Sequence, residues 1–202
     1  MNAARCRVAA VALCTFLLPG CALVSPVNVD TKKYVLSSIP ADLPATPTQP
    51  VTLLVLPPEA KPIYATTQMA YTIKAYEVAY FSQNEWAETP SQMIQPLIVE
   101  TLRRTGQFSE VLPSPHFARH TFVLRTEIIE LKQDFTSDPA ALRLALRFTL
   151  SREATNQVIA ARTLALQEPM QERTPYAGVV AANAAMEKLL RAFAGFMTEK
   201  AR

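Results

Sequence analysis

The sequence predicts an α+β domain in which two helices pack on one face of a mixed, largely antiparallel sheet. Residues 140–151 alternate strictly between apolar and other side chains, which is typical of a strand with one buried face. Thr89-Pro90 and Thr174-Pro175 each place a threonine at a helix N-cap and a proline at the first helical position. The predicted order is strands, helix, three strands, helix, and this order favours a sheet covered by helices.

The first 20 residues have the features of a secretory signal. Arg5 and Arg7 precede an uncharged apolar run at residues 8–18, which is too short for a permanent transmembrane helix. Leu18-Pro19-Gly20-Cys21 resembles the bacterial lipoprotein box, in which the cysteine is acylated and becomes the first residue. We expect a lipoprotein signal peptide at residues 1–20, a lipidated tether at 21–33 and a single periplasmic domain at 34–200.

Three segments before the first helix are predicted to be extended. Tyr34-Val35-Leu36 is expected to form a short strand. The apolar run at residues 51–56, ended by two prolines, is typical of a central strand buried on both faces. Alternating aromatic and polar residues between positions 71 and 80 predict two short strands or one bent strand.

The first helix is expected to begin after Thr89 and to close at Gly106. Gln92 completes a capping box, and glycine is the usual residue just past a helix end. Pro96 lies inside this segment and removes an internal hydrogen bond. We therefore expect a kink at Pro96, or a helix whose regular part begins near it.

The second half of the chain predicts strands at residues 108–112, 121–131, 140–151 and 158–167, and then a helix from Thr174 to about Glu199. The last three strands have similar lengths, which favours an antiparallel meander. The final helix carries an apolar stripe formed by Val179, Met186, Leu190, Phe193 and Met197.

Composition excludes several classes of function. The chain has 202 residues and only four glycines, which stand at least 17 residues apart, so no phosphate-cradling loop, dinucleotide fingerprint or G-x-S-x-G elbow is present. Without Arg5 and Arg7, 18 basic side chains face 17 acidic ones, a balance that argues against binding of nucleic acid. We expect no cofactor.

Several short motifs occur in a characteristic order between about Tyr34 and Leu190. After the lipoprotein cysteine they are Tyr34-Val35-Leu36, Val55-Leu56-Pro57, a tyrosine-rich hairpin leading to Trp86-Ala87-Glu88-x-Pro90, Arg104-Thr105-Gly106-Gln107-Phe108-x-x-Val111 and an alanine-rich last helix. Together they resemble the ABC-type transport auxiliary lipoproteins, the PqiC-like subunits of MCE-domain transport systems.

This resemblance implies a non-enzymatic lipoprotein at the distal end of an intermembrane lipid-transport apparatus that supports envelope integrity. Its implied partners are a periplasmic MCE-domain protein and, through it, an inner-membrane permease and an ATPase. Position 22 is Ala rather than Asp. By resemblance to the lipoprotein sorting rule, this implies an acyl anchor in the outer membrane, with the domain facing the periplasm. A symmetric partner favours a homo-oligomer.

Two other functions remain open at this point. One is an envelope-assembly or structural lipoprotein that works without a transporter. The other is a periplasmic hydrolase, which would need a nucleophile beside a positioned base. The only histidines, His116 and His120, fall beside prolines, where neither a helical metal site nor a catalytic pair is expected. We expect them in a surface loop.

Arginines on the predicted strands are the candidate docking residues. Arg143 and Arg147 share a face, and Arg125 and Arg162 lie on neighbouring strands. They form either a basic patch for anionic head groups or an acidic partner, or the ordinary polar side of a half-covered sheet.

Aromatic and acidic residues give two further candidates. Trp86 and the tyrosines at positions 71, 76 and 80 are either core residues or the lining of a docking groove. Glu127 and Glu130 are separated by an odd number of residues, so we expect them on opposite faces of their strand rather than paired for acid–base chemistry.

Overall fold

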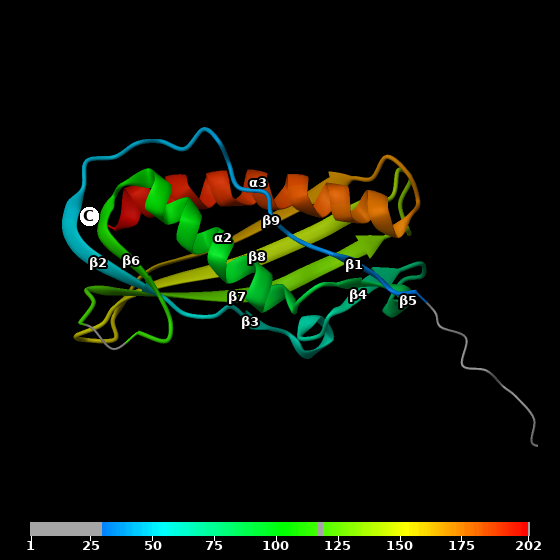
Figure 1. Ribbon diagram of the computed structural model, residues 1–202, viewed down its shortest axis with the longest axis horizontal. Helices are drawn as coiled ribbons and strands as arrows, with labels where there is room; N and C mark the ends of the chain where they lie inside the picture. The colour runs from blue at the N-terminus through cyan, green and yellow to red at the C-terminus, as the bar shows by residue number, and fades with distance from the viewer. Residues whose placement is uncertain (1–29, 117–118, 202) are drawn as a thin grey trace, which may run out of the picture. The chain divides into compact units, whose positions relative to one another are not determined.

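The structure is a computed structural model that describes residues 30–116 and 119–201 (Figure 1). The expectations for the signal peptide and for Cys21 lie outside the described residues. The chain from Thr31 onward forms one unit. No helix in the part of the chain that the structure describes is long and apolar enough to span a bilayer.

The described unit is an α+β fold, as predicted. Its sheet has nine strands, and its two long helices lie on the same side of that sheet in Figure 1. The elements are β1 (Lys32–Tyr34), β2 (Gln49–Val55), β3 (Glu59–Ala60), the 3-10 turn η2 (Pro62–Tyr64), β4 (Gln68–Thr72), β5 (Ala79–Trp86), α2 (Pro90–Thr105), β6 (Phe108–Pro113), β7 (Phe122–Asp134), β8 (Ala141–Arg152), β9 (Val158–Pro169) and α3 (Pro175–Lys200).

Strand β7 joins the two parts of the sheet. Along one edge it pairs antiparallel with β8, which in turn pairs antiparallel with β9, so the predicted meander is confirmed. Along its other edge β7 pairs in parallel with β2, β3 and β4, each over only two or three residues. The sheet is therefore mixed, with long antiparallel pairings and short parallel ones. Further parallel pairs join β2 to β6 and β1 to β5, and β4 pairs antiparallel with β5.

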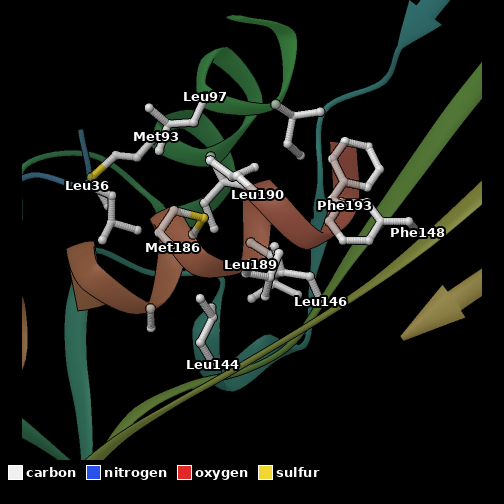
Figure 2. Packing of buried hydrophobic residues seen from close by; sticks show 14 of the residues in the cluster. Leu36, Met93, Leu97, Leu144, Leu146, Phe148, Met186, Leu189, Leu190 and Phe193 are labelled. Carbon is white, nitrogen blue, oxygen red and sulfur yellow. The ribbon is translucent and has the colours of Figure 1, made fainter. Parts of the chain in front are cut away.

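Alternation along β8 buries one row of its side chains beneath α3. The row consists of Leu142, Leu144, Leu146, Phe148 and Leu150, each at most 1% exposed. The rings of Phe148 and Phe193 stack with centroids 4.0 Å apart. Figure 2 shows α3 between the sheet and α2, with Leu189 and Phe193 toward β8 and Leu190 toward Met93 and Leu97. Removing this apolar surface from water is the main source of stability for the fold.

Helix α2 has the ends that its sequence predicts. The Gln92 side chain accepts a hydrogen bond from the Thr89 N–H at 3.1 Å. Gly106 ends the helix in the left-handed conformation with φ of 68°, which glycine adopts without steric penalty. The helix continues unbroken through Pro96, so the expectation that its regular part begins there was wrong. Pro96 is exposed, and so is Gln92, the residue whose carbonyl loses its helical partner.

The first strand lies two residues earlier than predicted. It ends at Tyr34, and the chain then crosses the helices as an irregular strap of residues 35–48 (Figure 1). Asn183 of α3 fixes the start of this strap, because its side-chain oxygen accepts hydrogen bonds from the N–H groups of Ser37 and Ser38 at 2.9 and 3.2 Å. Leu36 is buried in the core as a result.

A bulge in β7 changes the predicted relation between two glutamates. Glu127 lies opposite Arg147 and Glu130 lies opposite Ala145, with a register shift between Ile128 and Glu130. Positions 145 and 147 share a face of β8, so Glu127 and Glu130 share a face of β7. The expectation of opposite faces was wrong. The bulge inserts one extra residue between Glu127 and Glu130, so two residues that are three positions apart point to the same face.

Gly178 allows the N-terminal part of α3 to approach the end of β7. A Cβ at this position would lie 2.0 Å from Cδ of Gln133. Gln133 is buried and donates a hydrogen bond from Nε2 to the Pro175 carbonyl at 3.0 Å. The amide therefore occupies the space that a side chain at position 178 would need.

We predict that Gly178→Ala destabilises the protein, whereas Gly195→Ala, its matched control in the same helix, does not. Alanine improves helix propensity by about 1 kcal/mol at either position. At position 178 this gain is offset by overpacking against Gln133, which costs about 1–3 kcal/mol, whereas nothing lies within 4 Å of a Cβ at Gly195. Urea unfolding of both variants measures the difference. Equal gains in stability would contradict the close packing at Gly178.

Candidate docking face

The side of β7 and β8 that faces away from the helices carries most of the candidate residues. Cross-strand neighbours share a face, and this side is opposite to the buried row of β8. We call it the open face. Its polar members are Arg125, Glu127, Glu130, Lys132, Asp134, Arg143, Arg147 and Thr149.

Acidic side chains accompany the cations of the open face. Arg147 Nη1 lies 3.6 Å from Glu127 Oε2, and Lys132 Nζ lies 3.1 Å from Glu130 Oε1. Arg143 forms an ion pair with Asp134. The face is thus a ladder of opposite charges and not an uncompensated basic patch. Such a ladder favours a polar partner of complementary pattern over a purely anionic surface.

The pair between Arg143 and Asp134 is the most buried of these contacts. The Asp134 side chain is only 6% exposed. Its Oδ1 accepts hydrogen bonds from the N–H and the hydroxyl of Thr136. Burial acts to raise the pKa of Asp134, but the hydrogen bonds from Thr136 and Arg143 and the charge of Arg143 outweigh it and hold that pKa below its ordinary value. This pair is a structural contact, because the carboxylate is not presented to a partner.

The pair between Arg147 and Glu127 is more accessible. The two side chains are 55% and 40% exposed, and the pair borders a hollow of about 250 Å³. The hollow is lined by Glu59, Arg125, Thr126, Glu127, Arg147 and Thr149. Arg125 donates a hydrogen bond to the Ser151 hydroxyl at 3.0 Å, which fixes its guanidinium. Charged groups of both signs are therefore exposed around one depression.

Arg162 does not belong to the open face. It lies opposite Phe148 in the pairing of β8 with β9, so its side chain is on the helix side of the sheet. Its guanidinium lies over the Phe196 ring of α3, 5.7 Å from the centroid. The sequence could not place it, because the register between two strands decides which of their residues share a face.

The aromatic candidates do not form a common groove. Trp86 is 4% exposed and belongs to the core, so its indole is not presented to a docking partner. Tyr71 stacks on Phe81 with ring centroids 4.4 Å apart, and Tyr80 donates a hydrogen bond to the Ile63 carbonyl at 3.1 Å. Tyr76 is fully exposed in the turn between β4 and β5.

His120 lies near an acidic partner. Its Nε2 atom is 3.2 Å from Glu153 Oε2. Within residues 30–116 and 119–201, no group of three histidine, cysteine, aspartate or glutamate side chains is arranged to hold a metal ion.

An apolar hollow that was not predicted from the sequence lies between the end of β9 and α3. It has a volume of about 410 Å³ and includes Tyr176 and Val180, which are 63% and 51% exposed. Both residues lie beside the buried stripe of α3 and not within it. Large apolar residues just outside a helical stripe are the signal that could have identified this exposed flank.

The comparison with protein families decides the assignment. Residues 34–194 match the family described as ABC-type transport auxiliary lipoprotein component. The chain belongs to this family. The resemblance inferred from the motifs is thereby confirmed, and the family is one of auxiliary lipoproteins and not of enzymes.

Solved structures support the fold of this auxiliary lipoprotein. A Xanthomonas campestris protein of the DUF330 family superimposes with a TM-score of 0.70 at 17% identity, covering 82% of this chain and 92% of its own. An uncharacterised protein gives a TM-score of 0.66 at 14% identity, with 83% and 99% covered. No curated protein matches the chain in sequence.

One of the motifs on which the resemblance was based, Arg104-Thr105-Gly106-Gln107-Phe108, has a structural role in this fold. Gly106 ends α2, and the next residue, Gln107, donates hydrogen bonds from Nε2 to the carbonyls of Met197 and Ala201 at 3.2 and 3.1 Å. One short loop therefore ends the first helix and caps the C-terminus of the second.

We predict that Asp134→Asn lowers the free energy of unfolding at pH 7 by about 1–3 kcal/mol, because a charge-assisted hydrogen bond to Arg143 is lost. The native pKa lies below the ordinary value of 3.8, so the wild-type carboxylate stabilises the fold above about pH 4. This contribution is lost as the pH falls through the native pKa. Denaturant titrations at neutral and acidic pH measure the difference between the two proteins.

Glu127→Gln is the matched control on the same face. Its pair with Arg147 is largely solvated, so the expected change is about 0.5 kcal/mol or less. An Asp134→Asn effect as small as that of Glu127→Gln, or one that grows toward low pH, would contradict the role given to Asp134.

Proposed function

We propose that this auxiliary lipoprotein is held at the outer membrane by acyl chains on Cys21 and docks the periplasmic MCE component of an ABC-type lipid-transport system. The observation that carries the proposal is family membership over residues 34–194, preceded in the sequence by a lipoprotein-type leader and a short tether. In this proposal the role is geometric. The anchor confines the domain to one membrane surface, where a moderate affinity suffices because the effective concentration of the partner is high.

The open face is the proposed docking surface. Its exposed pair, Arg147 with Glu127, borders a hollow and presents both signs of charge. Opposite charges in a fixed pattern contribute to specificity and to the rate of association more than to affinity. Arg143 is not proposed to contact the partner directly, because its guanidinium is already paired with Asp134.

We predict that Cys21→Ser yields an unacylated, uncleaved precursor, because the thiol is the site of lipid attachment and cleavage at this position requires it. Intact-mass analysis and membrane fractionation measure acylation and residence. Ser25→Ala, four residues downstream, is the control and should be processed normally. Unchanged outer-membrane residence of the Cys21→Ser chain would contradict the anchor.

We also predict that Arg147→Glu reduces recovery of the MCE-domain partner by about tenfold, because it places like charges together on the docking surface. The double variant Arg147→Glu with Glu127→Arg restores a local pair with reversed polarity and should remain defective. Arg104→Glu is the control, since Arg104 and Glu100 form a pair of similar exposure on α2. Quantitative co-purification from detergent extracts compares the variants, and normal recovery with Arg147→Glu would exclude this face.

A further inference from the structure

The turn between β4 and β5 carries an exposed apolar cluster. Ile73 and Val78 are 59% and 40% exposed, and Tyr76 between them is fully exposed. Among the described residues, three of the nine exposed large apolar side chains therefore lie within one six-residue turn, residues 73–78. We call this turn the tip. Apolar side chains gathered in this way mark a surface that contacts a partner or a membrane.

Tyr76 is held in a conformation that ordinary side chains avoid. Its φ is 67°, and the turn is closed by a hydrogen bond from the Glu77 N–H to the Lys74 carbonyl at 3.2 Å. Tyr76 is thus the third residue of this β-turn, a position where glycine is usual when φ is positive. A large aromatic residue is strained there, and its ring makes no buried contact that would offset the strain. The exposed ring points to a contact outside the domain.

The tip lies at the end of β5 toward which β1 leads when β1 is followed upstream. β1 pairs in parallel with β5, with Lys32 opposite Asn84 and Tyr34 opposite Trp86. Going upstream along β1 therefore follows β5 back toward Ala79, the residue that directly follows the tip (Figure 1). The segment from Cys21 to Thr31 has ten steps along the chain, which span at most about 35 Å when fully extended. A membrane that holds Cys21 is within reach of the tip.

We propose that the tip is a second membrane contact, in which Tyr76, Ile73 and Val78 enter the headgroup region of the bilayer beside the acyl anchor. This inference rests on the lipid anchor of the proposed function. Tyrosine suits this region because its ring is apolar and its hydroxyl remains hydrated. Lys74 and Glu77 have opposite charges, so the contact is mainly apolar and persists at high salt. The anchor supplies attachment, and the tip fixes the orientation of the domain.

The test uses the mature chain, residues 21–202, with Cys21→Ser, so that binding reports the tip and not acyl chains. Tyr76→Trp places a fluorophore at the tip, while Trp86 is buried and gives a constant background. Vesicles of phosphatidylethanolamine and phosphatidylglycerol should shift the emission to the blue, and brominated acyl chains should quench it. Val158→Trp is the control, because Val158 is 57% exposed at the opposite end of the sheet. Its emission should not respond.

Tyr76→Gly separates loss of membrane contact from loss of folding. Glycine accepts the positive φ, so this variant should unfold at the same or a higher temperature than its parent, yet its partition to vesicles should fall by about tenfold. No response at position 76, an equal response at position 158, or full vesicle binding by Tyr76→Gly would overturn the inference. The inference would also be overturned if the tip did not bind vesicles and instead cross-linked to a protein.

This assay needs neither acylation nor the transport partner, so its outcome is independent of the docking experiments. Failed recovery of an MCE-domain protein would leave a positive vesicle result intact. Conversely, the absence of a fluorescence response to vesicles at position 76 would not affect the docking experiments on the open face.

Discussion

The burial of one row of β8 beneath α3 is the contact on which the rest of the structure depends. Leu144, Leu146 and Phe148 fill the space under Leu189 and Phe193, and this packing decides which side of the sheet faces the helices. The polar row of β8 must then point the other way, because neighbouring residues of a strand alternate between faces. The open face with its ion pairs is therefore a direct consequence of how the core is filled.

The sequence predicted the elements whose patterns are local. The caps of α2 and the N-terminus of α3 follow from spacing within one segment, and the meander of β7, β8 and β9 was predicted from the similar lengths of three consecutive strands. The parallel pairings of β7 with β2, β3 and β4 did not follow, because periodicity identifies a strand and its buried face but not its neighbour. β3 has only two residues, too few for any pattern. The bulge in β7 reversed the relation of Glu127 and Glu130 for the same reason, since it depends on pairing with β8.

The candidate site was predictable only within single strands. Arg143 and Arg147 share a face because both lie on β8, whereas Arg162 lies on β9, whose register the sequence does not encode. The sequence also did not predict that acidic residues of β7 pair with these arginines. Because of these ion pairs, the face is not a basic patch. The sequence also could not decide whether Trp86 lies in the core or on a docking surface, because an aromatic residue of a strand faces either side depending on how the strand is paired.

The tip and the open face together define how the domain would stand at the membrane. The tip follows Thr72 of β4, which pairs with Asp134 at the end of β7, so it lies at the same end of the sheet as Arg143. Strand β8 has 12 residues, which extend for about 40 Å. With the tip at the bilayer, the start of β7 and the end of β8 would lie farthest from the membrane, and Arg147 would lie partway along the two strands on a solvated surface. In this proposal a second membrane contact would do more than strengthen attachment, because it would fix the direction in which the open face points and so whether a partner that crosses the periplasm could reach it.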